Sequence, residues 1–218
     1  MKFKRFIFVL ILGHNLFVSG QDSYDFLTSL PPDEKSILAV SSSNLGNYTA
    51  SNGESFYEFK EDGVWIVSTI YSSISKETIR ESTKYTVKNG YIFGVVLGDS
   101  LPCELEEDRY YFGMRNREQI IGGSSKHELK KVNSNSYIIN FYENGGFTPS
   151  LFTFSGKTLQ VQHFDYETGT TMFESIDSQS NNQKEGMNYI TLNPTEKEWS
   201  KLDKSKLFIS IIDYNRVD

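Results

Sequence analysis

The sequence predicts an all-β protein, an antiparallel meander closed or nearly closed as a barrel, with short N-terminal and C-terminal helices. Three observations favour this class. Aromatic residues make up 14% of the 218 residues, and the strand-forming Tyr and Phe far outnumber Trp. Turn signals such as Asn-Gly, Asp-Gly and Gly-Gly separate β-prone runs at intervals of roughly ten to fifteen residues. Closing the sheet would remove exposed edges that favour aggregation.

The clearest element is a hairpin over residues 85–97, centred on Asn89-Gly90. Both turn residues tolerate the positive φ that a type I′ turn needs. Before the turn Tyr85 and Val87 alternate with polar residues, and after it the chain is almost entirely apolar up to Leu97. The pattern predicts a half-exposed strand paired with a strand that is buried on both faces or forms a barrel wall.

The first twenty residues have the pattern of a signal peptide. Lys2, Lys4 and Arg5 form a positive region, which is followed by an apolar stretch and by small residues at 18–20. We therefore expect residues 1–20 to be removed and the protein to be exported, to a periplasmic, cell-surface or extracellular location. The apolar run is short and interrupted, so no stable membrane span is expected after cleavage. An uncleaved N-terminal anchor is the alternative.

The remaining chain is acidic and has one cysteine. Residues 1–20 hold three basic and no acidic residues, so 19 basic and 28 acidic residues remain, a net charge of −9. Such a surface repels phosphate, and nucleic acid is therefore not an expected partner. Because Cys103 is the only cysteine, an internal disulfide is excluded and core packing must stabilise the fold.

The expected organisation after the signal peptide has four parts. They are an N-terminal helical segment over residues 21–44, an antiparallel β-barrel domain over 45–177, a flexible loop over 178–186 and a C-terminal strand–helix–strand extension packed on the barrel over 187–218. The N-terminal helix is expected at about residues 32–40, because prolines and acidic residues suit a first helical turn. The C-terminal helix is expected to begin at Asn193, with Glu196 as its third residue.

Three short stretches occur in this order along the chain: Leu45-Gly46-Asn47-Tyr48, residues 56–63 ending in Asp-Gly, and residues 85–92. Together they resemble secreted bacterial lipocalin-like proteins, which open with a Gly-x-Trp-like element and continue with strands of these two types. Tyr48 stands where the family has Trp. The resemblance implies a small antiparallel barrel that holds an apolar ligand in its mouth, and it implies no particular site residues.

A ligand in such a barrel would contact inward-facing apolar side chains. The residues expected to line this site are Tyr91, Phe93, Gly94, Val95, Tyr110 and Phe112. Without a side chain, the glycine of this set either marks a sharp bend or leaves room for a ligand.

No catalytic residue or cofactor is expected. The sequence lacks a Gly-x-Ser-x-Gly elbow, a His-Glu-x-x-His motif, a phosphate loop and a dinucleotide fingerprint. No metal site is assigned. The candidates for one would be His163, Asp165 and Glu167, which alternate along one expected strand, and a solvated strand end is the alternative explanation for them.

Two functions follow from these patterns. The first is an exported non-catalytic binding protein that holds a small apolar or amphipathic ligand in a β-barrel. The alternative is an envelope or secreted protein-interaction module that has a filled barrel, binds no ligand and uses an aromatic sheet face. The sequence does not identify the protein partner.

Overall fold

The computed structural model describes residues 23–50, 55–164, 173, 175, 176, 179–184 and 187–217. The expected signal peptide therefore lies outside the described residues. Within them the protein is all-β and mostly antiparallel, with few helices. The strands are β1 (Ser23–Phe26), β2 (Ser36–Ile37), β3 (Gly46–Ala50), β4 (Ser55–Lys60), β5 (Gly63–Ser75), β6 (Thr86–Lys88), β7 (Tyr91–Phe93), β8 (Ser100–Glu106), β9 (Arg109–Ile121), β10 (Glu128–Lys131), β11 (Ser136–Glu143), β12 (Gly146–Ser155), β13 (Thr158–Phe164), β14 (Gln179–Lys184), β15 (Met187–Leu192) and β16 (Phe208–Val217). The helices are α1 (Lys76–Glu81), α3 (Glu196–Lys201), α4 (Lys204–Leu207) and a 3-10 turn at Ser42–Asn44.

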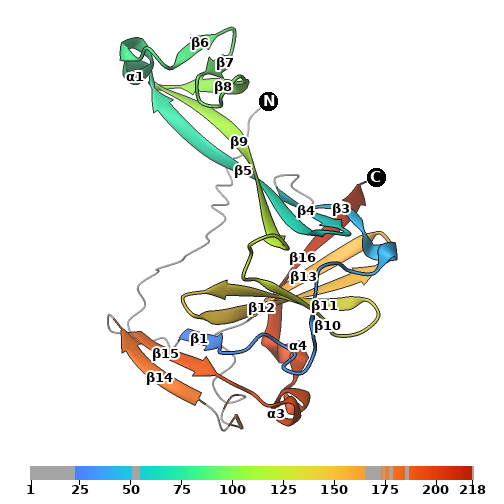
Figure 1. Cartoon of the computed structure of the whole chain (residues 1–218). Helices are drawn as coiled ribbons and strands as arrows, with labels where there is room; N and C mark the ends of the chain where they lie inside the picture. The colour runs from blue at the N-terminus through green and yellow to red at the C-terminus, as the bar shows by residue number, and fades with distance from the viewer. Residues whose placement is uncertain are drawn as a thin grey trace.

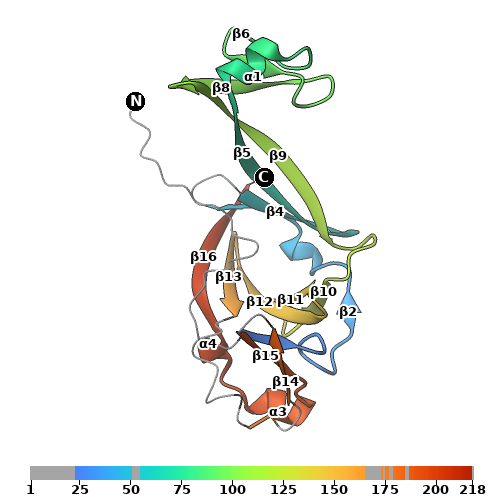
Figure 2. The same cartoon turned by 90° about the vertical axis from the view of Figure 1, so that its left-hand side faces the viewer.

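The described strands form one sheet that curls without closing (Figure 2). Its order is β14-β15-β1-β12-β13-β16-β3-β4-β5-β9-β8-β7-β6, and β11, β10 and β2 branch from β12. A closed barrel would need β9 to pair with β10. Instead, the free edge of β10 pairs with β2, where Leu129 lies opposite Ile37. The predicted all-β antiparallel class is confirmed, whereas barrel closure is not.

The molecule has a body, an arm and a distal module (Figure 1). The body comprises the described residues up to 68 and from 118 onward. β5 and β9, each 13 residues long, leave the body together as a two-stranded arm of residues 69–75 and 109–117. Residues 76–108, with α1 and β6–β8, form the distal module at the end of the arm. Because the long hairpin carries this module away from the body, its strands are not part of a barrel wall.

The interior of the curled sheet is filled by aromatic side chains. Phe152 on β12 and Tyr57 on β4 have ring centroids 5.2 Å apart, and Phe59 and Phe154 lie 5.1 Å apart. Tyr48 contacts both of the latter rings edge-on. Interleaved rings of this size leave little of the interior for a ligand, because protein cores pack at crystal-like density.

A second core covers the outer side of β11, β12 and β13. Ile138 of β11 belongs to this core, whereas its neighbours Tyr137 and Ile139 face the aromatic interior, so β11 is buried on both faces. Trp199 of α3 and Phe208 at the start of β16 pack into the same outer cluster. The C-terminal part of the chain therefore completes the body.

The N-terminal helix predicted over residues 32–40 does not form. The Leu30 N–H donates to Asn140 Oδ1 at 2.8 Å, and Asn140 Nδ2 donates back to the Leu30 carbonyl at 2.8 Å. Lys130 Nζ donates to two further backbone carbonyls of the segment, both at 2.9 Å. These bonds tie residues 29–31, immediately before the predicted helix, to β10 and β11, and within that helix Ser36–Ile37 instead pairs with β10 as β2. The two sets of contacts outweigh the modest helical preference of so short a stretch.

Two C-terminal predictions also need correction. Residues 179–184, expected in a flexible loop, form β14 and pair with β15, because backbone ladder bonds require no apolar side chains. The helix starts two residues later than expected, since Thr195 is its N-cap and forms a capping box with Glu198. The final strand β16 inserts between β13 and β3.

Candidate functional site

The predicted hairpin is present at the tip of the distal module. Asn89 and Gly90 have φ values of 53° and 79°, and Lys88 lies opposite Tyr91. The prediction of a long buried strand after the turn is wrong. β7 ends at Phe93, and of its three residues only the central isoleucine is buried, because one face of the module is open to solvent.

The six residues predicted to hold a ligand lie in or beside the distal module and not inside the body. Two open surface pockets occur there. The first, of about 450 Å³, includes Phe93 and Gly94 in its lining. The second, of about 260 Å³, includes Val95 and Phe112. The two tyrosines of the predicted set line neither pocket. The structure thus distributes four of the six residues over two separate surface depressions.

Gly94 marks a backbone bend. Its φ is +84°, and a Cβ there would overlap the backbone carbonyl oxygen of Lys84. Gly94→Leu is therefore expected to lower the free energy of unfolding by about 1–3 kcal/mol, measured by urea denaturation. Gly98→Leu is the matched control, because Gly98 has a similar φ of +77° with open space around it. Equal losses in the two variants would contradict a steric role for Gly94.

One face of the arm carries exposed aromatic and basic side chains. Tyr71 lies opposite Gly113, and Ser73 lies opposite Tyr111. Since side chains alternate along a strand, the side chains of these residues point to the same side of the arm as those of the odd-numbered residues of β9 from 109 to 117. We define the arm face as the surface on this side of the arm, which is formed by Thr69, Tyr71, Ser73, Arg109, Tyr111, Gly113, Arg115 and Arg117. Tyr71 is 67% exposed and Tyr111 44%, whereas Phe112 on the opposite side of the arm is buried.

Gly113 lies between Thr69 and Tyr71 on the arm face. A Cβ on Gly113 would stand 2.7 Å from Thr69 Cγ2, which is too close, and 3.4 Å from the Tyr71 ring, which is an ordinary contact. Tyr111 is a diagonal neighbour of Tyr71 on the adjacent strand, at a typical Cα spacing of about 7–8 Å. The two tyrosines therefore lie diagonally across the two strands on one side of the arm, and we call them the aromatic surface.

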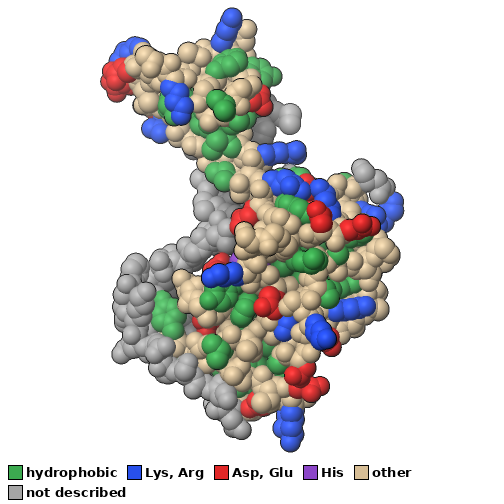
Figure 3. Space-filling view, in the orientation of Figure 1, with side chains coloured by type: hydrophobic (Ala, Val, Ile, Leu, Met, Phe, Trp, Pro, Cys, Tyr) green, Lys and Arg blue, Asp and Glu red, His purple; other side chains and the backbone are tan. Residues whose placement is uncertain are grey.

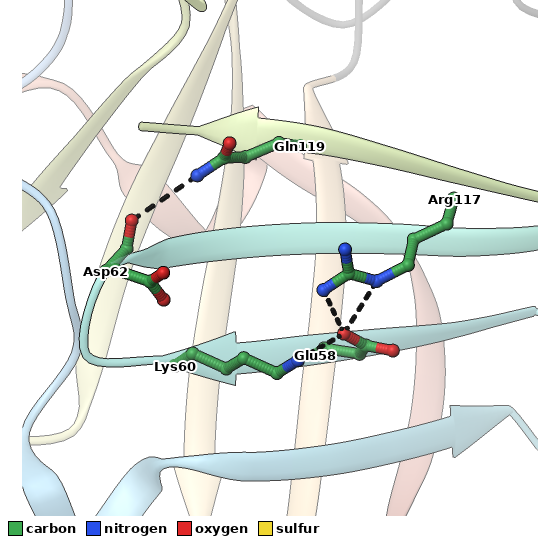
Figure 4. A network of polar contacts seen from close by, with 5 residues as sticks. All are labelled: Glu58, Lys60, Asp62, Arg117 and Gln119. Atoms are coloured by element: carbon green, nitrogen blue, oxygen red, sulfur yellow. Dashed lines mark hydrogen bonds and ion pairs between the residues drawn. The ribbon is translucent and has the colours of Figure 1, made fainter. Parts of the chain in front are cut away.

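Basic side chains gather where the arm meets the body (Figures 3 and 4). Nε and Nη2 of Arg117 donate to Glu58 Oε2 at 3.0 and 2.7 Å, and Lys60 Nζ lies 3.0 Å from the same oxygen. The Arg117 hydrogen bond is the main reason that the pKa of Glu58 is lowered. Figure 4 also shows Gln119 donating to the Asp62 carbonyl, at 3.3 Å, which ties β9 to the β4–β5 turn.

Two arginine side chains at the base of the arm also lie over aromatic rings. Arg117 lies 4.6 Å from the Trp65 ring centroid and Arg115 lies 5.5 Å from that of Phe56. Arg115 makes no ion pair with any residue that the structure describes. Arg117 and Lys60 therefore share the Glu58 carboxylate, and together with Arg115 they give the base of the arm three basic side chains against the carboxylates of Glu58 and Asp62 (Figure 4).

Of the three candidate metal ligands, the described residues include His163 alone. His163 of β13 contacts Ser150, with its Nδ1 3.1 Å from the serine Oγ. Asp165 and Glu167 lie outside the described residues. Over the part of the chain that is described, no group of three or more His, Cys, Asp or Glu side chains is placed to hold a metal ion. Burial raises the pKa of Cys103, which disfavours a reactive thiolate.

We expect two histidines to make the stability of the fold depend on pH. Burial lowers the pKa of His127, against the opposing effect of nearby carboxylates, and it also lowers that of His163. The Tyr142 N–H donates to His127 Nδ1 at 2.8 Å, which requires an unprotonated Nδ1. The unfolded chain protonates histidine below about pH 6.5 and the folded chain only at lower pH. Stability is therefore expected to fall as the pH is lowered from about 7 to 5.

The test is urea unfolding at several pH values in this window. A His127→Asn/His163→Gln variant keeps hydrogen-bonding side chains that do not titrate, so it should show a flatter pH dependence than the wild type. Identical pH profiles for the two proteins would show that the histidines are not responsible.

Comparison of the chain with protein-family models, curated proteins and solved structures returns no match. In the described residues, no helix combines the length and apolar content needed to cross a membrane.

Proposed function

We propose that this protein is a non-catalytic protein-interaction module that binds its partner through the arm face. The observation that carries the proposal is the exposure of Tyr71 and Tyr111 on a projecting arm, while the described rings of the body are buried or half-buried. Aromatic and arginine side chains are enriched at protein interfaces and dominate their energetics. A narrow arm that projects from a filled body is suited to docking against another protein.

We further propose that the protein acts after export, at a periplasmic, cell-surface or extracellular location. The support is the sequence pattern of residues 1–20, a positive region followed by an apolar stretch and small residues.

A second candidate function is the binding of a small apolar ligand. The pocket of about 450 Å³ beside Phe93 and Gly94 favours it, because ligand sites in proteins are mostly apolar depressions of about this size or larger. A ligand enclosed by a closed barrel is less well supported, since the aromatic rings of Phe152 and its neighbours occupy the interior of the body.

The arm-face proposal is tested by site-specific photo-crosslinking of the exported protein in its native surroundings. A photoreactive phenylalanine analogue at position 111 should give a discrete protein adduct, whereas the same analogue at Thr158, an exposed body position, should not. Tyr71→Ser should abolish the adduct. Ile211→Ser is the matched control, because it removes an exposed apolar side chain from β16. No adduct at position 111 above the level at position 158 would refute the proposal.

A further inference from the structure

We infer that the partner of the arm face is a second copy of this chain, with the two arms packed face to face in antiparallel orientation. This inference rests on the proposed function, since it names the partner of the same surface.

The arm presents charge and aromatic character in a fixed order along β9. At the distal end, the β8–β9 turn and the adjoining part of β8 carry the carboxylates of Glu104, Glu106, Glu107 and Asp108. Of these, Glu104 lies opposite Tyr111 and therefore points to the arm-face side. The aromatic surface occupies the middle of the arm and the arginines occupy the base.

The spacing of these three groups is close to symmetric. At ~3.4 Å per residue along β9, Arg109 and the β8–β9 turn just beyond it lie about 10–13 Å from the level of Phe112, the midpoint of the two tyrosines, and Arg115 and Arg117 lie about 10–17 Å on the other side. A twofold axis through the aromatic surface would therefore bring the acidic turn of each copy against the arginines of the other copy. Interfaces of this isologous kind are the commonest in homodimers.

Local charge at each end supports the pairing. The base has three cations, Arg115, Arg117 and Lys60, of which the last two pair with Glu58, and Asp62 of the adjoining β4–β5 turn adds a second carboxylate (Figure 4). The distal turn has four carboxylates and two cations, Arg109, which is held on the arm by hydrogen bonds to Ser73, and Lys76, whose backbone N–H donates to the Asp108 carbonyl. The net charge, −9 without residues 1–20, repels a second copy at long range. Physiological salt screens that repulsion beyond about 8 Å, so close contacts decide the outcome.

The inference is tested by charge reversal and sedimentation velocity. Arg115→Glu/Arg117→Glu and, separately, Glu104→Arg/Glu107→Arg should each raise the dimer dissociation constant by at least about 100-fold, because both place like charges together. All four positions are exposed, so circular dichroism should not change. The melting temperature of the arginine variant should fall slightly, because Arg117→Glu sets a second carboxylate beside Glu58. An equimolar mixture of the two variants should recover a heterodimer, since every reversed contact is again complementary.

The outcomes separate this inference from the proposed function. Wild-type dimers that weaken with salt, together with recovery in the mixture, support the second copy. A wild type that stays monomeric up to its solubility limit, or a mixture that does not recover, overturns it. If the wild type is monomeric while position 111 still crosslinks to a different protein, the second copy is wrong and the proposed function stands. If position 111 crosslinks to nothing, the proposed function fails as well.

Discussion

Replacing Phe152 with Ala is expected to lower the free energy of unfolding by about 3–5 kcal/mol. Phe152 is fully buried at the centre of the aromatic core, where its ring contacts Tyr57 and Phe59. Truncation removes these contacts and leaves a cavity that rigid neighbouring rings cannot refill. The measurement is equilibrium unfolding in urea. Ile211→Ala is the control, because Ile211 is 56% exposed and should lose little stability.

The same variant tests how completely the body is filled. The new cavity would be apolar and is expected to take up xenon, as engineered apolar cavities do. The wild-type body is expected to take up none. A stability loss below about 1 kcal/mol for Phe152→Ala would mean that the site repacks or was never tightly packed, contrary to the filled interior described above.

Replacing Asn140 with Leu is expected to cost about 2–4 kcal/mol, because it leaves the buried N–H and carbonyl of Leu30 without partners. Asn140 is fully buried and also donates to the Glu128 carbonyl at 3.4 Å. The expected structural result is release of the N-terminal segment from β10 and β11, seen as faster hydrogen exchange in residues 27–37. Asn215→Leu is the control, since Asn215 is exposed on β16. Unchanged exchange in that segment would show that Asn140 does not hold it.

The local structure of the sheet could be predicted from short-range patterns. The Asn89-Gly90 turn is determined by the φ values that its two residues tolerate, and the all-β class follows from the spacing of such turns. The absence of the N-terminal helix could not be predicted, because the competing hydrogen bonds come from Asn140, which lies 110 residues away from Leu30 in the sequence. A local pattern contains no information about a partner at that distance.

Part of the candidate site could be predicted from the sequence. Arg109, Tyr111, Gly113, Arg115 and Arg117 alternate along β9 and could have been recognised as one face of a strand. Tyr71 could not be added to that face without the register of β5 and β9. Exposed and buried tyrosines also follow the same alternation, so the sequence does not distinguish those of the arm from those of the aromatic core.

The central claim, that the protein binds another protein through its arm and holds no small ligand in its body, is tested most directly by native mass spectrometry. The protein would be purified from its natural source without denaturation. The predicted result is a complex containing only polypeptide chains, which Tyr71→Ser dissociates and Ile211→Ser leaves intact. The contradicting result is a single chain that retains a small apolar molecule at one-to-one stoichiometry in the wild type and in both variants.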